Sequence, residues 1–147
     1  MASLPAQVLL IEANPDHAEL FMRLLEEHRL PNRVYYLQDG QTALDYLFRS
    51  GAYADPQKSP RPDVIILGLR LPDVDGFEVL RIIKESEKLK SIPVIIFTTS
   101  ETDEEIKRSY LQHANSYLVK PVGFDEFTKL IDDLGYYWFG LNIQPLP

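Results

Sequence analysis

The stretch Pro62-Asp-Val-Ile-Ile-Leu-Gly-Leu-Arg-Leu-Pro-Asp-Val-Asp-Gly76 decides the fold of this chain. Its first half contains Val64 to Leu67, a short apolar run rich in β-branched residues, which predicts a buried strand at the centre of a sheet. The Leu-Pro and Asp-Gly pairs of the second half end this strand and predict a helix that begins near Phe77. Ligands and chemistry in α/β sheets usually lie at the carboxyl end of such a strand. That position is Gly68, which has no side chain to supply chemistry.

The same alternation of strand and helix continues on both sides of this stretch. Further short apolar runs predict strands at residues 8–11, 34–37, 93–97 and 117–119. Apolar residues at three- and four-residue spacing predict helices at about 15–29, from 40, from 77, at about 102–113 and from 124. The inward residues expected for the second helix are Ala43, Leu44, Leu47 and Phe48. Because short loops connect alternating strands and helices, we expect an α/β fold: a doubly wound, five-stranded parallel sheet between two helical layers.

Two helix starts carry capping signals, and one connection is predicted to be a loop. Asn14-Pro15 supplies an N-cap residue with proline at the first helical position. Thr102-Asp-Glu-Glu105 matches a capping box. Residues 50–61 contain a glycine and two prolines, which predict a surface loop.

Composition excludes several classes of function. The net charge of −7 argues against nucleic acid as a direct partner, because phosphate binding needs clustered Lys and Arg. The chain has no cysteine, which rules out disulfides, thiolate zinc sites and cysteine nucleophiles. No signal peptide and no apolar run of membrane-spanning length can be identified. We therefore expect a cytoplasmic protein without a membrane partner.

Several short motifs occur in an order that resembles response-regulator receiver domains of the CheY-like type. They are Ile11-Glu-Ala-Asn-Pro15, Leu71-Pro72, Asp75-Gly76, Thr98 and Lys120-Pro121. The resemblance covers essentially the whole chain and implies the flavodoxin-like (βα)5 receiver fold. It also implies a single receiver domain over residues 1–147, with a core at about 6–134 and a tail at about 135–147.

Among receivers, the chain is most similar to the stand-alone receivers that partner bacterial phytochromes. Phe97-Thr-Thr-Ser100, His113-Ala-Asn115 and the segment from Trp138 to Pro147 carry this similarity. It implies a place in two-component signalling, with a histidine kinase of the phytochrome type or another receiver as the partner. It also implies a homodimer.

The resemblance places the three acidic positions of the phosphorylation pocket on residues of which two are not acidic. Receivers accept a phosphoryl group on an aspartate, with a magnesium ion held by neighbouring acids. The pair of acids after the first strand falls on Glu12 and Ala13, and the phosphoacceptor falls on Gly68. One of three acidic positions therefore keeps its carboxylate. Magnesium binding is expected to be weak or absent.

Three other positions of the pocket are retained. The switch hydroxyl falls on Thr98, the aromatic switch on Tyr117 and the lysine on Lys120. For Tyr117 we favour core packing over a moving switch. Because a buried charge is costly unless it is paired, we expect Lys120 to pair with Glu12. Arg70 is expected either to share this pair as a pocket filler or to point into solvent.

Other acids and the histidines are weaker candidates. Asp75 precedes a glycine at a helix entrance, where an acid is favourable for local reasons, and Asp73 is expected in a solvated loop. Asp63 lies at the opposite end of the strand. His17, His28 and His113 have no shared ligand spacing and are expected at the surface or at helix edges.

The tail predicts an interface. Tyr136-Tyr-Trp-Phe139 places four aromatic residues in one helical turn, too many for a single buried stripe. Exposed aromatic clusters mark interfaces, so we expect a C2 dimer through Tyr136, Trp138, Phe139 and the segment to Pro147. The alternative is that the tail folds back on its own domain.

Three functional hypotheses follow from these residues. The first is a non-enzymatic pseudo-receiver that acts through protein–protein contacts, independently of phosphorylation. The second is a phosphorelay receiver that a histidine kinase phosphorylates at a non-standard aspartate, Asp73 or Asp75. The third, a flavodoxin-like cofactor enzyme, shares the fold class, but the sequence has no glycine-rich phosphate loop to support it.

Overall fold

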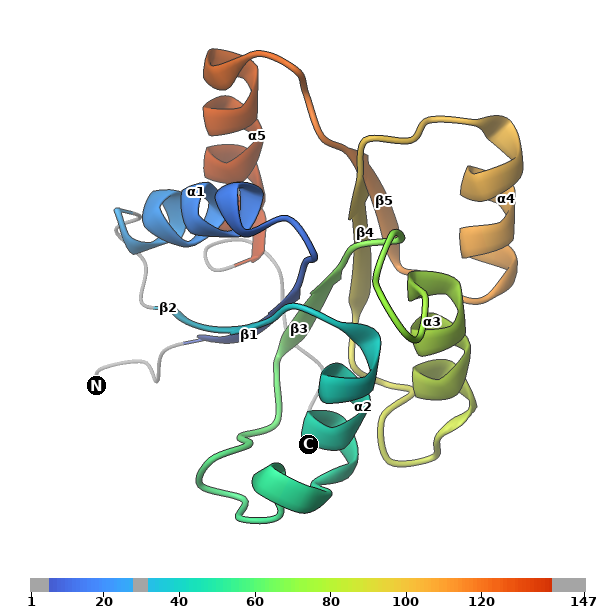
Figure 1. Cartoon of the computed structure of the whole chain (residues 1–147). Coiled ribbons are helices and arrows are strands. Elements are labelled where there is room, and N and C mark those ends of the chain that lie inside the picture. The colour runs from blue at the N-terminus through green and yellow to red at the C-terminus, as the bar shows by residue number, and fades with distance from the viewer. Residues whose placement is uncertain (1–5, 28–31, 139–147) are drawn as a thin grey trace.

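A computed structural model describes residues 6–27 and 32–138. Its elements are β1 (Ala6–Ile11), α1 (Pro15–Glu26), β2 (Asn32–Leu37), α2 (Gly40–Phe48), η1 (Gly51–Tyr53), β3 (Val64–Leu67), α3 (Gly76–Glu85), β4 (Val94–Thr98), α4 (Asp103–Leu111), β5 (Ser116–Val119) and α5 (Phe124–Tyr136). The five strands form one sheet in the order β2-β1-β3-β4-β5, and all the pairings are parallel. The predicted fold class is confirmed (Figure 1).

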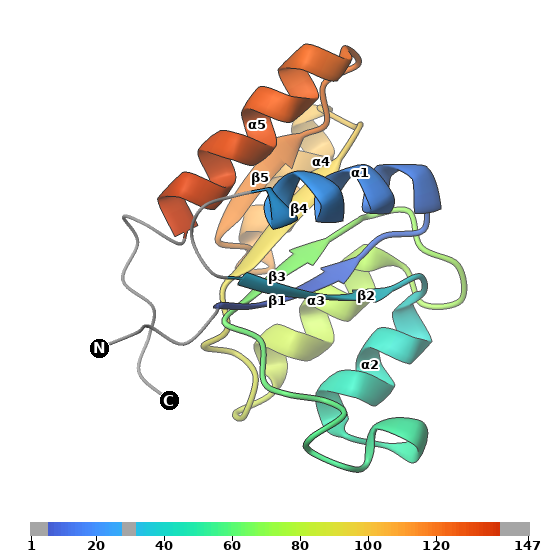
Figure 2. The same ribbon diagram turned by 90° about the vertical axis from the view of Figure 1, so that its left-hand side faces the viewer.

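Helices cover both faces of the sheet. Figures 1 and 2 show α1 and α5 on one face and α2, α3 and α4 on the other. Side chains alternate along a strand, so Leu9 and Ile11 join the core on the α2 and α3 side. Val8 and Leu10 join the core beneath α1 and α5. In the sheet, β1 has β2 on one side and β3 on the other, so the order of the strands reverses direction at β1. Such a reversal leaves a crevice at the carboxyl ends of β1 and β3.

The stretch that decides the fold forms β3, a tight loop and the start of α3. All four residues of β3 are buried, as expected for a central strand. Gly76 packs so closely against this strand that a Cβ there would lie 2.2 Å from the carbonyl oxygen of Gly68. Asp75 caps α3, since its Oδ1 accepts a hydrogen bond of 3.0 Å from the backbone N–H of Glu78. The predicted loop and helix start are confirmed.

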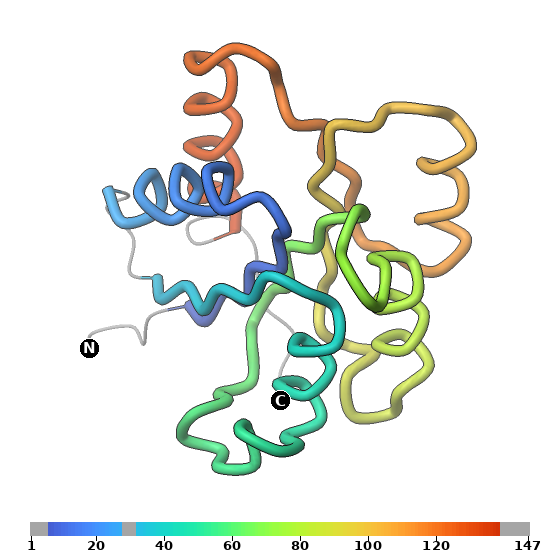
Figure 3. The backbone as a smooth tube through the Cα atoms, viewed as in Figure 1, coloured from blue at the N-terminus to red at the C-terminus, as the bar shows by residue number. Residues whose placement is uncertain are grey.

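Two details of the helices differ from expectation. Helix α1 ends at Glu26 rather than near Arg29, and residues 28–31 lie outside the described part of the chain. On α2, Tyr46 is buried while Phe48 is 47% exposed, so the expected inward position of Phe48 is wrong. The reason is the loop after α2, which returns beside this helix (Figure 3) and offers the carbonyl of Pro60 to the Tyr46 hydroxyl at 2.9 Å. Burial raises the pKa of Tyr46 to about 12.

The predicted caps form, but the capping box does not close. Asn14 caps α1 by accepting hydrogen bonds from the N–H groups of Asp16 and His17, at 3.0 and 3.3 Å. Thr102 caps α4 through a hydrogen bond of 3.3 Å from the N–H of Glu105. The carboxylate of Glu105 binds side chains outside its own helix end instead of returning to Thr102. In the described ranges, no helix combines the length and the apolarity that crossing a membrane requires.

Candidate functional site

An open hollow lies where β1, β3 and β4 end, beside the loop that follows β5. Its lining combines residues from four separate parts of the chain: Glu12, Ala13, Asn14, His17, Gly68, Leu69, Arg70, Phe97, Thr98, Thr99 and Lys120. The parallel sheet explains this convergence, because all its strands end at the same edge. The predicted pocket positions Glu12, Ala13, Gly68, Thr98 and Lys120 are brought together here.

Glu12 and Lys120 form a buried ion pair at the floor of the hollow. Lys120 Nζ donates to Glu12 Oε1, and the two residues are 9% and 6% exposed. The other carboxylate oxygen of Glu12 accepts a hydrogen bond of 3.0 Å from the N–H of Asn14. The Tyr36 hydroxyl donates to the backbone carbonyl of Glu12 at 2.8 Å, which fixes the chain at this point. The expected pairing of Glu12 with Lys120 is therefore present.

His17 is a third member of this cluster that the sequence analysis missed. Its Nδ1 lies 3.0 Å from Lys120 Nζ. Because a charged lysine can only donate, this contact requires Nδ1 to accept, which puts the ring proton on Nε2. The available signal was the Asn14 cap, which fixes the first turn of α1 and with it the direction of His17. Lys120 also lies 5.4 Å from the centre of the Phe97 ring, a cation–π contact.

Gly68 faces this pair and leaves room where an acid is expected. Its N–H donates to the Ile11 carbonyl at 2.9 Å, so the backbone continues the sheet. A Cβ at Gly68 would lie 3.3 Å from the Ile11 oxygen and 3.8 Å from Oε2 of Glu12. A Cβ here would require the Ile11 carbonyl to shift by a few tenths of an ångström. The hollow therefore lacks a carboxylate at both Gly68 and Ala13, and at Gly68 a Cβ itself meets only one tight contact.

Thr98 and Tyr117 both contact the loop between β4 and α4. Thr98 is buried at the end of β4, and its Oγ1 accepts a hydrogen bond of 3.3 Å from the N–H of Ser100. The Tyr117 hydroxyl donates to the carbonyl of Ser100 at 2.8 Å. The Tyr117 ring is half-buried against the core of the α2 and α3 side, and burial raises the pKa of its hydroxyl.

Arg70 lines the hollow but does not share the pair of Glu12 and Lys120. Its guanidinium binds both carboxylate oxygens of Glu105, at 2.7 and 2.9 Å, and its side chain is 69% exposed. This pairing lowers the pKa of Glu105 and raises that of Arg70. The expectation that Arg70 fills the pocket is therefore corrected: it bridges to α4.

The remaining candidate acids have other surroundings. Asp73 is exposed in the loop after β3, with a left-handed backbone φ of 66°. Asp75 is the cap of α3. Asp63 accepts a hydrogen bond of 2.8 Å from the N–H of Gln7 at the opposite end of the sheet. His113 lies two residues beyond the end of α4 in a left-handed conformation and is not among the residues that line the hollow.

The hollow supplies one carboxylate side chain as a ligand for magnesium. This ion prefers near-octahedral oxygen coordination through carboxylates, phosphates and retained water. Glu12 is the one acid among the residues that line the hollow, and both of its oxygens accept hydrogen bonds from the protein. Across the residues that the structure describes, no three His, Asp or Glu side chains gather in a metal-binding arrangement.

The aromatic residues at the end of α5 divide between core and surface. Tyr136 and Tyr137 are 58% and 49% exposed. Trp138 packs on the core beneath α1 and α5, and its ring stands edge-on to Tyr137 with centroids 5.7 Å apart. The predicted interface residue Phe139 and the segment to Pro147 lie outside the described residues.

Comparison with known proteins places this geometry in a family. The response regulator receiver domain matches residues 8–132. The probable methanogenesis regulatory protein FilR2 of Methanothrix harundinacea is 42% identical over 97% of this chain and 90% of its own length. Response regulator Rcp1 of Synechocystis is 34% identical over 91% of this chain and 89% of its own.

A solved structure agrees in fold. The phosphorylated cyanobacterial phytochrome response regulator RcpA is 32% identical, covers 97% of this chain and 100% of its own, and superposes with a TM-score of 0.91. The flavodoxin-like receiver architecture and the similarity to phytochrome response regulators are thereby confirmed. The chain belongs to the family of response regulator receiver domains of two-component signalling.

Proposed function

We propose that this receiver works as a pseudo-receiver, a non-enzymatic module of two-component signalling that binds partners without accepting a phosphoryl group. The observation that carries the proposal is Gly68 at the end of β3, in the position where a receiver needs its nucleophile. Phosphoryl transfer depends on positioning and charge stabilisation around an attacking atom. A glycine at this position supplies no attacking atom.

The electrostatics of the hollow support the same conclusion. The ammonium group of Lys120 neutralises the carboxylate of Glu12, so it acts as a cation tethered to the protein. A divalent ion would have to displace Lys120 from Glu12 and then remain beside a buried positive charge. Both steps are unfavourable, because a buried charge without a partner is costly. Function without a bound metal is therefore part of the proposal.

The proposed partner is a histidine kinase, of the phytochrome type, or a second receiver that such a kinase phosphorylates. Family membership and the similarity to the phytochrome response regulator RcpA support this assignment. The net charge of −7 supports a protein partner rather than nucleic acid, and we place the interaction in the cytoplasm. Binding would hold or sequester the partner.

We further propose that the module acts as a homodimer through the end of α5. Tyr136 and Tyr137 present neighbouring exposed aromatic surfaces, the residue type that is enriched at interfaces. Trp138, by packing on its own core, would fix the direction in which these two rings project. Phe139 and the following residues to Pro147 would extend the same contact.

The test is incubation with acetyl phosphate, or with beryllofluoride, in the presence of magnesium. The two measurements are intact mass and backbone amide NMR shifts. The positive control is a receiver that has the phosphoacceptor aspartate and both metal-binding acids. The proposal predicts no mass gain and no shift. A hydroxylamine-sensitive gain of one phosphoryl group would overturn it and favour a phosphorelay receiver that uses Asp73 or Asp75.

A second measurement addresses the partner. Titration with a phytochrome-type histidine kinase, before and after its autophosphorylation, should give the same dissociation constant. Binding that disappears after autophosphorylation, or phosphoryl transfer in the mixture, would contradict phosphorylation-independent docking.

A further inference from the structure

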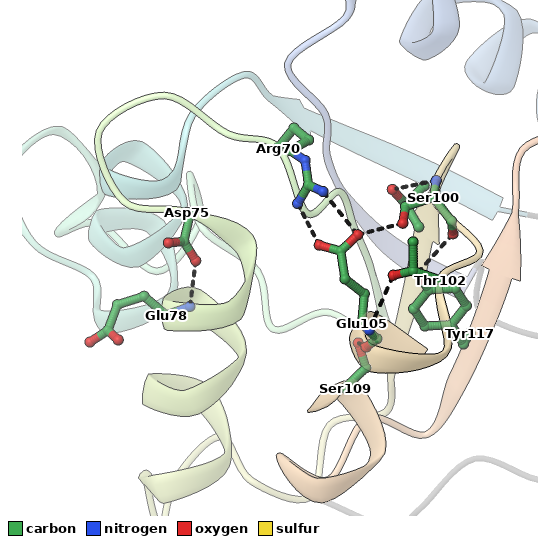
Figure 4. A network of polar contacts seen from close by, with 9 residues as sticks. Arg70, Asp75, Glu78, Ser100, Thr102, Glu105, Ser109 and Tyr117 are labelled. Atoms are coloured by element: carbon green, nitrogen blue, oxygen red, sulfur yellow. Dashed lines mark hydrogen bonds and ion pairs between the residues drawn. The ribbon is translucent and has the colours of Figure 1, made fainter. Parts of the chain in front are cut away.

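A network of polar contacts connects the loop after β3 with α4 and β5 (Figure 4). Its centre is Glu105, whose carboxylate binds the guanidinium of Arg70 through two contacts of 2.7 and 2.9 Å. The same carboxylate accepts a hydrogen bond from the hydroxyl of Ser100. The carbonyl of Ser100 in turn accepts a hydrogen bond of 2.8 Å from the hydroxyl of Tyr117.

The four side chains come from four different segments. Arg70 follows β3, Ser100 lies between β4 and α4, Glu105 is in the first turn of α4, and Tyr117 is on β5. The network also reaches the hollow, because the N–H of Ser100 donates to Oγ1 of Thr98. The guanidinium of Arg70 is therefore connected, through Glu105 and Ser100, to the loop between β4 and α4. This loop contacts Thr98 and Tyr117, the two switch positions of the receiver.

We propose that Arg70 is a latch that holds the loop between β4 and α4, and through Ser100 the hydroxyl of Tyr117, in one arrangement. The arrangement needs no phosphoryl group, since every contact is made by protein atoms already in place. The face formed by α4 and β5 is therefore set constitutively. This inference rests on the contacts themselves and stands whether or not the hollow accepts a phosphoryl group.

The exposure of the pair limits how strongly the latch holds the loop. The Arg70 side chain is 69% exposed and that of Glu105 is 16% exposed, so water and salt weaken their attraction. The latch is stronger than a lone surface pair because the fork of the guanidinium matches the carboxylate and Ser100 shares the same acceptor. Loss of Arg70 should increase opening of the loop by about five-fold, the upper end of the range for a surface ion pair.

The experiment compares Arg70→Ala with Arg81→Ala in the full chain. Arg81 is the control, because its exposed ion pairs, with Glu78 and with Glu85 at 2.6 Å, lie within α3 and do not include Glu105 or Ser100. Hydrogen exchange of backbone amides is measured over residues 99–111. The ring signals of Tyr117 are followed by NMR and identified by their loss in Tyr117→Phe.

The latch predicts faster exchange over this segment and a shifted Tyr117 signal in Arg70→Ala, with neither change in Arg81→Ala. Glu105→Gln should shift Tyr117 in the same direction, and Arg70→Lys, which keeps the charge but not the planar fork, should change both readouts less than Arg70→Ala. Salt at about 1 M should move the native protein towards Arg70→Ala. Equal exchange in the two alanine variants, or changes confined to residues 69–71, would overturn the inference.

Discussion

Glu12 and Lys120, 108 positions apart in the chain, form an ion pair that is almost completely buried at the end of the sheet. The lysine thereby occupies the charge environment that a receiver otherwise prepares for a metal and a phosphoryl group. Since His17 also contacts Lys120 Nζ, at 3.0 Å, the ammonium is surrounded by acceptors from α1 and from the residue after β1. The hollow is neutralised by its own side chains.

Removing one partner of this pair should destabilise the fold strongly. Lys120→Met leaves the carboxylate of Glu12 buried without its cation, so the free energy of unfolding should fall by about 3–5 kcal/mol. Urea unfolding followed by tryptophan fluorescence measures the change. The double variant E12Q/K120M, which has no buried charge at these positions, should be more stable than Lys120→Met alone. Equal stability of the single and double variants would show that the charges are not coupled.

Restoring the missing acids should restore phosphoryl chemistry. In A13D/G68D two carboxylates join Glu12, and a Cβ at position 68 meets its closest neighbour, the Ile11 oxygen, at 3.3 Å. With magnesium and acetyl phosphate the double variant should gain one hydroxylamine-sensitive phosphoryl group, measured by intact mass. A13D/G68N is the control, with similar volume but no nucleophile, and should gain none. If A13D/G68D folds but stays unmodified, residues other than the two missing acids also prevent phosphorylation of this hollow.

The sequence predicted those features that follow from period and charge. The apolar runs identified all five strands and the order of helices between them, and the need to pair a buried Lys120 predicted Glu12 as its partner. Contacts that depend on loop paths were not predicted. Glu105 was assigned to a capping box, although the loop after β3 brings Arg70 to it. A local sequence motif cannot show which side chain from a distant part of the chain will bind a given residue.

The same limit applies to His17 and to α2. His17 reaches Lys120 because the Asn14 cap fixes the phase of α1, but the cap alone does not show that Lys120 lies opposite that turn. On α2 the period allows either aromatic residue to face inward. Tyr46 rather than Phe48 is buried because its hydroxyl can donate a hydrogen bond to the carbonyl of Pro60. This carbonyl becomes available only when the loop after α2 folds back.

A lysine on α3 should prove more important for stability than its exposed neighbours. Lys84 Nζ donates to the carbonyls of Lys90 and Ile92 and to Oδ1 of Asn115, at 3.0, 2.9 and 3.1 Å. Burial lowers the pKa of Lys84. Lys84→Met removes the donor from three acceptors, and the free energy of unfolding should fall by about 1–3 kcal/mol.

The matched control for Lys84→Met is Lys90→Met. The Lys90 side chain makes an exposed ion pair with Glu87 at 2.9 Å, and its backbone carbonyl, which Lys84 uses, is retained. Chemical denaturation should show a change of less than about 0.5 kcal/mol for this control. Similar losses in both variants would mean that Lys84 does not connect α3 to the start of β4.

The latch at Arg70 should open in acid. Hydrogen bonds from Arg70 and Ser100 lower the pKa of Glu105 below its usual value of 4.5. A carboxyl group with a lowered folded pKa contributes stability that is complete above its unfolded pKa and is lost as the pH falls through the folded one. The difference in stability between the native protein and Arg70→Ala should therefore be constant near neutral pH and shrink below about pH 4.5. A difference that persists in acid would exclude Glu105 as the partner that matters.

The exposed end of α5 makes the proposed dimer testable with two tyrosines of nearly equal exposure. Tyr137, which follows the last residue of α5, and Tyr110 on α4 are both 49% exposed, so their replacement removes similar aromatic surface. If the dimer uses the end of α5, Tyr137→Asp places a charge at the interface and should shift the protein to monomer in sedimentation velocity. Tyr110→Asp should leave the dimer intact, because α4 lies on the other face of the sheet from α5 (Figure 2). Tyr136→Asp should act like Tyr137→Asp, since Tyr136 is 58% exposed on the same helix end.

A dimer that Tyr110→Asp dissociates, while Tyr136→Asp and Tyr137→Asp keep it, would relocate the interface to α4. A native protein that sediments as a monomer at every concentration would remove the dimer from the proposal and leave docking to a heterologous partner.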